Sequence, residues 1–108
     1  MEQFMEEPPK PTPLQTILRE RGKTYGPFER HASISQAIKK AIFLYGYGMP
    51  IGLTPDQKEA LEMIAHKIAR IANGNPNHID NWDDIAGYAT LVADELRRVS
   101  DEAPTRAV

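Results

Sequence analysis

Apolar residues recur every three or four positions in four stretches of the chain, and this spacing places them on one face of an α-helix. The four stretches run near residues 14–21, 28–45, 55–73 and 81–99. No stretch shows the sustained alternation of apolar and polar residues that is typical of a half-buried strand. The pattern therefore predicts an all-α fold, a small four-helix bundle.

Residues that start or end helices separate the four stretches. The segment 22–27 is rich in glycine and other helix breakers, so we expect a loop after the first helix. Thr54, with Pro55 next to it and Gln57 three positions later, predicts the capped start of the third helix. Asp80 is the expected N-cap of the fourth helix, because its side chain can accept a hydrogen bond from a free backbone N–H group.

The third and fourth helices are expected to form an antiparallel hairpin, because both are long and a tight turn joins them. Their apolar stripes then face each other, with Leu61, Ile64, Ile68 and Ile71 on the third helix and Trp82, Ile85, Ala89 and Val92 on the fourth. This arrangement predicts that Trp82, Ile85, Ile64 and Ile68 lie in one core.

The two ends of the 108-residue chain are too polar and proline-rich to join that core. Residues 1–12 predict a flexible, disordered arm, residues 13–100 the helical domain, and residues 101–108 a frayed tail. A core drawn from so few residues is often only marginally stable on its own. We therefore expect the protein to self-associate as a homo-oligomer, a dimer.

Composition narrows the classes of partner. The formal net charge of -2 supplies no positive field for nucleic acid, so a nucleic-acid partner is not expected. The chain has no cysteine, which excludes disulfides and thiolate metal sites and fits a reducing compartment. No apolar run approaches the ~20 residues that span a bilayer, and the acidic start lacks the basic region of a secretory signal. We expect a cytoplasmic protein without a membrane partner.

Glu59 and Glu62 are the first candidates for chemistry. They lie three positions apart on one face of the third helix, so their carboxylates can share one divalent cation or face a phosphate-binding surface. The same spacing is also ordinary on a solvated helix face.

Asp84 is the acid that helix capping explains least well. Tyr88 and Leu91 follow it at positions that lie above it on the helix, forming a second apolar patch beside the carboxylate. A carboxylate partly buried there needs a cation, and Lys67, Arg70 or a bound metal are the candidates across the hairpin.

Gly87 lies inside the fourth helix, where glycine costs ~1 kcal/mol relative to alanine. Such a glycine suggests that something packs closely against the helix at that point. A neighbouring helix, a second subunit or a ligand would each fit, and Tyr88 with Leu91 is the candidate interface.

Three segments carry a resemblance to a known group of proteins: Arg21-Gly22-Lys23-Thr24-Tyr25-Gly26-Pro27-Phe28, His66-Lys67-Ile68-Ala69-Arg70-Ile71 and Asp80-Asn81-Trp82-Asp83-Asp84-Ile85-Ala86-Gly87-Tyr88-Ala89. Over about residues 19–97 the chain resembles an uncharacterised family of small proteins from tailed phages and prophages. More distantly, its layout is similar to that of the all-α MazG-like nucleoside triphosphate pyrophosphatases, which bind magnesium through Glu-x-x-Glu and Glu-x-x-Asp motifs. The first resemblance implies the cytoplasm of a bacterial host cell.

The second resemblance implies a magnesium site. Glu59 and Glu62 match the first motif, and Asp84 matches the aspartate of the second. Asn81 stands where the second motif has its glutamate, and Asp80 is a displaced substitute for it. In such a site the magnesium ion lies on the phosphates and positions the attacking water. The basic residues available to neutralise the phosphates are Lys23, Arg30, Lys67 and Arg70.

Two functions of different class follow. The missing glutamate favours a noncatalytic phage or prophage accessory protein that acts by binding a protein partner. The clustered acids and bases favour the alternative, a magnesium-dependent nucleotide pyrophosphohydrolase-like bundle that binds a nucleotide. The residues by themselves do not decide whether the protein is an enzyme, or whether it takes Mg²⁺ or no cofactor.

Overall fold

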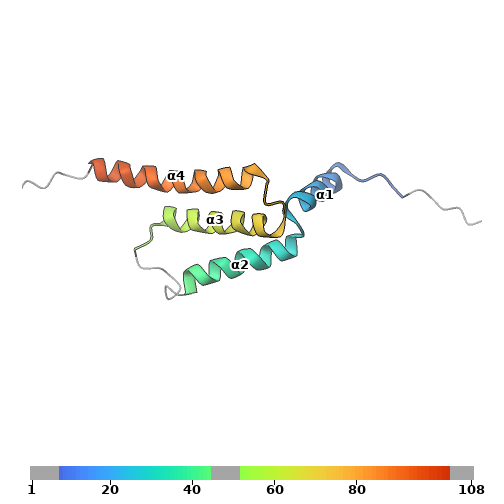
Figure 1. The fold of residues 1–108 in the computed structure, drawn as a ribbon, viewed down its shortest axis with the longest axis horizontal. Coiled ribbons are helices and arrows are strands. Elements are labelled where there is room, and N and C mark those ends of the chain that lie inside the picture. The colour runs from blue at the N-terminus through green and yellow to red at the C-terminus, as the bar shows by residue number, and fades with distance from the viewer. Residues whose placement is uncertain (1–7, 45–51, 103–108) are drawn as a thin grey trace, which may run out of the picture.

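The computed structural model describes residues 8–44 and 52–102. These residues form four α-helices and no strand, with α1 spanning Pro13–Tyr25, α2 Phe28–Leu44, α3 Pro55–Asn73 and α4 Ile79–Glu102 (Figure 1). The predicted all-α four-helix fold is confirmed. Within the described residues, no helix is both long enough and apolar enough to cross a bilayer.

The capped helix start that the sequence predicted at Thr54 is confirmed. The Thr54 side chain accepts from the backbone N–H of Gln57, and the Gln57 side chain accepts from the backbone N–H of Thr54. The same reciprocal pair joins Thr12 and Gln15 at the start of α1. Each capping box satisfies two backbone donors that the first helical turn leaves free.

Two predicted helix boundaries are wrong. Helix α1 continues through Gly22 to Tyr25, because one exposed glycine in a helix costs only ~1 kcal/mol and the chain turns at Gly26 instead. Helix α4 begins at Ile79, so Asp80 lies in its first turn and is not its N-cap. The end of α4 reaches two residues into the predicted tail, and the rest of that tail, 103–108, lies outside the described residues, as do residues 1–7 of the predicted arm.

Helices α2, α3 and α4 lie side by side with α3 in the middle (Figure 1). Helices α3 and α4 form the predicted antiparallel hairpin, and α2 packs on the opposite flank of α3. Within the described residues α2 and α4 do not approach each other, so the three helices make an open layer with two faces. Helix α1 lies at one end of this layer, against α2 and α3.

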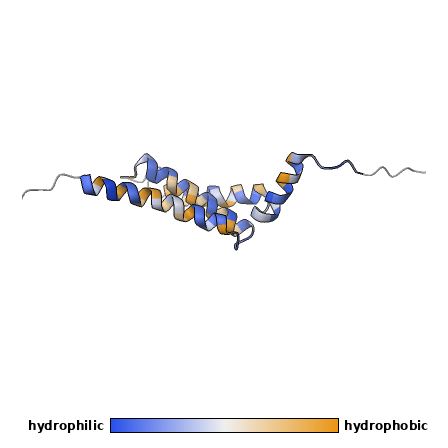
Figure 2. Cartoon of the chain, turned by 90° about the horizontal axis from the view of Figure 1, so that it is seen from above, coloured by the Kyte–Doolittle hydropathy of each residue, from blue (hydrophilic) through white to orange (hydrophobic). Residues whose placement is uncertain are grey.

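The core of the single chain is thin. Among the described residues, the buried apolar side chains are Ala60, Ala65 and Ala69, all on α3, and the buried polar ones are His31, Ser35, Lys67 and Asn81. Of the four residues predicted to share this core, Ile64 and Ile85 are half-buried. The prediction is wrong for Trp82 and Ile68 in one chain, because their exposed fractions are 52% and 42%. Helix α3 has α2 on one flank and α4 on the other, and because these two do not meet, no further helix of the described residues lies across its apolar stripe. Figure 2 shows that both apolar and polar residues occur along the helices of this open arrangement.

The turn between α1 and α2 is fastened to the end of α3. The side-chain N–H groups of Asn73 donate to the backbone oxygens of Tyr25 and Pro27 at 3.0 and 2.8 Å. Gly26 has a φ of 77° and lies against the backbone of Asn73 so closely that a Cβ would overlap it. Gly74 lies against Thr24 in the same way. The last turn of α1 is therefore held rigidly over α3, and this fixed corner shapes the site described next.

Candidate functional site

A cavity of about 460 Å³ lies where α1, α2 and α3 meet. The side chains that give it chemical character are Arg21 and Tyr25 from α1, Phe28 and His31 from α2, and His66 and Arg70 from α3. It thus combines two guanidinium groups, two imidazoles and two aromatic rings in one hollow. This volume falls in the range of pockets that hold small organic ligands.

The two arginines of the cavity carry charges that no carboxylate among the described residues neutralises. The guanidinium carbon of Arg70 lies 4.3 Å from the centre of the Tyr25 ring, a cation–π contact that fixes its position without cancelling its charge. Arg21 is exposed on α1. Neither arginine forms an ion pair with any carboxylate in residues 8–44 and 52–102.

His31 and His66 form a hydrogen-bonded pair at the inner side of the cavity. The Nε2 atom of His31 lies 3.2 Å from the Nδ1 atom of His66, and the Nδ1 atom of His31 is buried without a partner. A buried N–H group without an acceptor is rarer in proteins than an unpaired lone pair. We therefore assign the shared proton to His31 Nε2 as donor, which leaves the proton of His66 on its Nε2 atom.

The surroundings of the two histidines keep both rings neutral. Burial is the main cause that lowers the pKa of each ring, and the pKa of His66 falls to about 4. The charges that lower both values further are the cations Arg70, Lys39 and Lys67. Arg70 and Lys39 form no ion pair with the described carboxylates, so they leave positive charge near the histidines, which favours an anion.

Lys67 is the cation that partners Asp84. The Lys67 ammonium, on a buried side chain, lies 2.8 Å from a carboxylate oxygen of Asp84, and the hydrogen bond it donates lowers the pKa of Asp84. The sequence named Lys67, Arg70 and a bound metal as candidate partners of Asp84, and among the described contacts it is Lys67 that lies at the carboxylate. Asp84 itself is half-exposed at the surface of the hairpin.

The other acids predicted as metal ligands lie apart from this pair. Glu59 is exposed at a groove between α3 and α4, Glu62 is half-buried on α3, and Asp80 lies 3.4 Å from His78 at the start of α4. In the described part of the chain, no three histidine or acidic side chains come together in a group that could hold a metal ion. Among the described residues of one chain, Glu59, Glu62 and Asp84 are therefore not gathered into such a group.

Of the four predicted phosphate-binding residues, Arg70 lines the cavity. Lys67 is held by Asp84, while Lys23 and Arg30 are exposed and lie outside the cavity lining. Arg21, His31 and the aromatic side chains of the cavity were not predicted from the sequence, whereas His66 shares with Arg70 the predicted polar face of α3. The signal that could have found Arg21 was the distinctive segment 21–28, which contributes half of the chemically active lining.

The predicted interface residues Tyr88 and Leu91 line the groove between α3 and α4, a hollow of about 650 Å³. Leu91 has an exposed fraction of 68%, and Tyr88 is half-buried. Within the described residues, nothing lies within 4 Å of the position that a Cβ would take on Gly87. The described residues of one chain therefore do not supply the close packing expected around this glycine.

Gly87→Ala is therefore expected to stabilise the protein. Alanine loses less backbone entropy than glycine in a helix, so the free energy of unfolding should rise by ~0.5 to 1 kcal/mol. Urea denaturation followed by circular dichroism measures the change. A loss of stability instead would show that another molecule packs closely at this turn of α4.

Comparison with known proteins gives a family but no activity. A family model described as "Domain of unknown function (DUF6378)" matches residues 12–96. No curated protein and no solved structure matches the chain. The matched segment begins at the N-cap of α1 and ends within α4, so it contains the whole cavity.

Proposed function

The chain belongs to the DUF6378 family, whose name assigns no activity, and we propose a function from the side chains of the cavity. The protein is a noncatalytic module that binds a phosphorylated aromatic ligand such as a nucleotide. The observation that carries this proposal is that two arginines without carboxylate partners in the described chain and an exposed aromatic ring line the same cavity.

The arginines supply the phosphate side of the proposed site. A guanidinium group donates two parallel hydrogen bonds to phosphate oxygens, and this geometry makes arginine a preferred phosphate ligand. Arg21 and Arg70 come from different helices, and both line the cavity. Neutral His66 adds one more N–H donor that does not depend on low pH.

Phe28 supplies the aromatic side. It is the first residue of α2, and 79% of it is exposed although its ring is apolar. A base that stacks on such a ring gains ~1 to 3 kcal/mol. A phosphate ion alone would leave the ring and much of the hollow unused, so a nucleotide matches the lining better than a bare phosphate.

The Lys67–Asp84 ion pair supports a noncatalytic role. A magnesium site of the pyrophosphatase kind needs several carboxylates on one ion, and here the ammonium already neutralises Asp84. Catalysis is the alternative proposal, and it requires a second chain to bring acids close to Glu59 and Glu62. The phage-type role in binding a protein partner is also a proposal, supported by the exposed apolar side chains of α4.

Isothermal titration calorimetry tests the binding proposal. We expect the wild-type protein to bind ATP more tightly than pyrophosphate and to bind adenosine weakly. Arg21→Ala should weaken ATP binding about 10- to 100-fold, because it removes a charge-assisted contact worth ~1.5 to 3 kcal/mol. Arg19→Ala is the matched control, since Arg19 is exposed on the same helix but outside the cavity lining. Equal losses in both variants would indicate a general charge effect and contradict the proposal.

Phe28→Ala separates a nucleotide site from a plain phosphate site. The substitution should weaken ATP binding about 10-fold and leave pyrophosphate binding unchanged, because only ATP has a base to stack. A wild-type protein that binds none of a panel of ribo- and deoxyribonucleotides at millimolar concentration would overturn the proposal. Metal-dependent release of pyrophosphate from any of them would contradict the noncatalytic part.

A further inference from the structure

One line of apolar side chains on α4 is left uncovered by the other described residues. Trp82, Ala89 and Leu96 recur every seven residues, so they follow one seam along the helix. All three are exposed, Trp82 by 52% and Leu96 by 54%. On the neighbouring helix α3, Ile68 is exposed by 42%. An apolar seam of this length in water is a site for association.

The seam lies on the side of the layer away from the polar features. Two residues along a helix correspond to a rotation of about 200°, so Trp82 points away from Asp84, and Ile68 points away from His66. The cavity and the Lys67–Asp84 pair therefore belong to one face of the layer, and the apolar seam belongs to the other. Because α2 and α4 do not meet, no helix of the described chain covers that second face.

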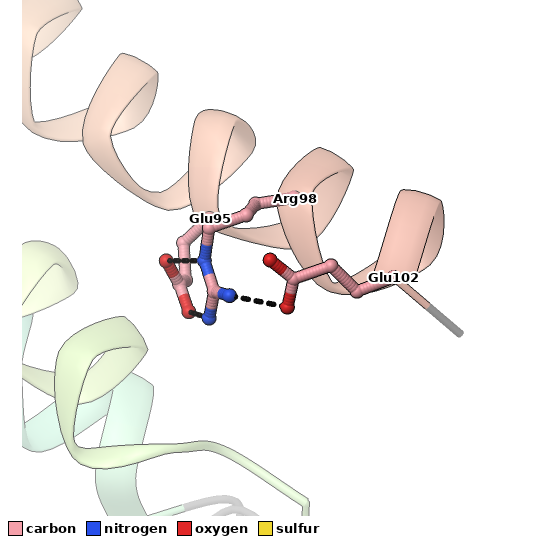
Figure 3. A network of polar contacts seen from close by, with 3 residues as sticks. All are labelled: Glu95, Arg98 and Glu102. Atoms are coloured by element: carbon pink, nitrogen blue, oxygen red, sulfur yellow. Dashed lines mark hydrogen bonds and ion pairs between the residues drawn. The ribbon is translucent and has the colours of Figure 1, made fainter. Parts of the chain in front are cut away.

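The end of α4 extends beyond its partner helix. Helix α4 has 24 residues and α3 has 19, so the last turns of α4 pass the start of α3. These turns are held by ion pairs within α4, where the Arg98 guanidinium lies between Glu95 and Glu102 at 2.6 Å from each (Figure 3). Such pairs stabilise a helix without tertiary packing. The last turns of α4 therefore stay helical although no other described helix packs against them.

The order of side-chain sizes along the seam indicates what covers it. A large residue stands at each end, Trp82 and Leu96, and a small one, Ala89, stands midway between them. A second copy that runs antiparallel matches this line, because alanine then meets alanine and each tryptophan meets the smaller leucine, whereas a parallel copy would set the two tryptophans against each other. We propose that two chains form a twofold dimer through this seam, with Ala89 at the axis and Trp82 against the partner's Leu96.

The area agrees with a stable dimer. With the exposed Val99 added to the seam, the face from Trp82 to Val99 is about 25 Å long, and two neighbouring helices are about 20 Å wide, so each copy covers on the order of 500 Å². A specific interface needs about 1,000 Å² in total, which is about 500 Å² per partner. A twofold interface makes each contact twice, so Trp82 of one chain meets the partner's Leu96 and Leu96 of that chain meets the partner's Trp82.

Two leucines of α4 make a matched test by analytical ultracentrifugation. Leu96→Glu should weaken the dimer by ~100-fold or more, because a twofold interface then buries two unpaired carboxylates. Leu91→Glu is the control, since Leu91 is at least as exposed but lies about 140° around the helix. If instead Leu91→Glu separates the subunits and Leu96→Glu does not, the interface is the Tyr88 and Leu91 patch and the proposal is wrong.

A cross-linking experiment tests the antiparallel register. The chain has no cysteine, so Ala89→Cys introduces a single thiol at the proposed axis, where it faces its own copy. Mild oxidation should join most Ala89→Cys chains into covalent dimers, while the adjacent Thr90→Cys control should remain mostly uncrosslinked. A monomeric wild-type protein at high micromolar concentration, or equal cross-linking at both positions, would overturn the proposal.

The single tryptophan reports the same contact without cross-linking. In the proposed dimer the partner's Leu96 covers Trp82, so wild-type emission should be blue-shifted and protected from acrylamide. Leu96→Glu should shift emission to the red and increase quenching, while Leu91→Glu should leave both unchanged. Unchanged emission in Leu96→Glu, with circular dichroism confirming that it is folded, would exclude the proposed register.

Discussion

Gly26→Ala is expected to lower the free energy of unfolding by ~3 kcal/mol or more. Gly26 has φ 77° and ψ -177°, a backbone region that only glycine populates readily, and a side chain there is strained by ~1 to 3 kcal/mol. The added Cβ also overlaps the backbone of Asn73. Relief of this overlap requires the corner to move away from α3, which breaks the two hydrogen bonds from the Asn73 side chain.

Urea denaturation of the variant measures the loss. Gly22→Ala is the matched control, because Gly22 lies in α1 with nothing within 4 Å of the position that a Cβ would take, and alanine there should stabilise the helix by ~0.5 to 1 kcal/mol. A Gly26→Ala protein within ~1 kcal/mol of wild type would show that the corner is not held against α3. Since Gly26 also lines the cavity, a large stability loss should be accompanied by loss of ATP binding.

The second expected result is a loss of stability as the pH falls from about 6.5 to 4. The folded pKa of His66 is about 4 and that of His31 is also lowered, so the unfolded chain binds protons in this range and the folded chain does not. Stability from these neutral rings is complete above pH ~6.5 and declines toward pH 4. Because His66 is half-exposed and screened by water, we expect a combined loss on the order of 2 kcal/mol.

Chemical denaturation at a series of pH values checks this slope. The double variant His31→Gln, His66→Gln should lose most of the change between pH 6.5 and 4, because glutamine does not titrate. The lowered pKa of Asp84 acts in a different range, since its stabilisation is lost only as the pH falls below ~4. A wild-type protein with constant stability from pH 7 to 4.5 would contradict the assigned pair.

Local sequence patterns were enough to predict the elements. The capping box at Thr54 involves residues three positions apart, and its geometry depends on one helical turn. Helical periodicity likewise predicted the bounds of α2 and α3 to within about a residue. It also predicted the α3–α4 hairpin, because the spacing of apolar residues along each helix specifies which face is apolar. The end of α1 was misplaced, since the tight contact that stops the chain at Gly26 comes from α3.

The candidate site depended on contacts between distant parts of the chain. His31 and His66 are 35 residues apart, and their hydrogen bond exists because α2 packs on the flank of α3 that carries polar residues. The sequence likewise left three candidates for the partner of Asp84. The packing of α3 against α4 brings Lys67 to the carboxylate. The apolar stripes by themselves predicted a buried Trp82. The tertiary structure overturned this prediction, because only α2 and α4 pack along α3 in the described chain. A periodic stripe specifies which face of a helix is apolar, but it does not specify whether the same chain covers that face.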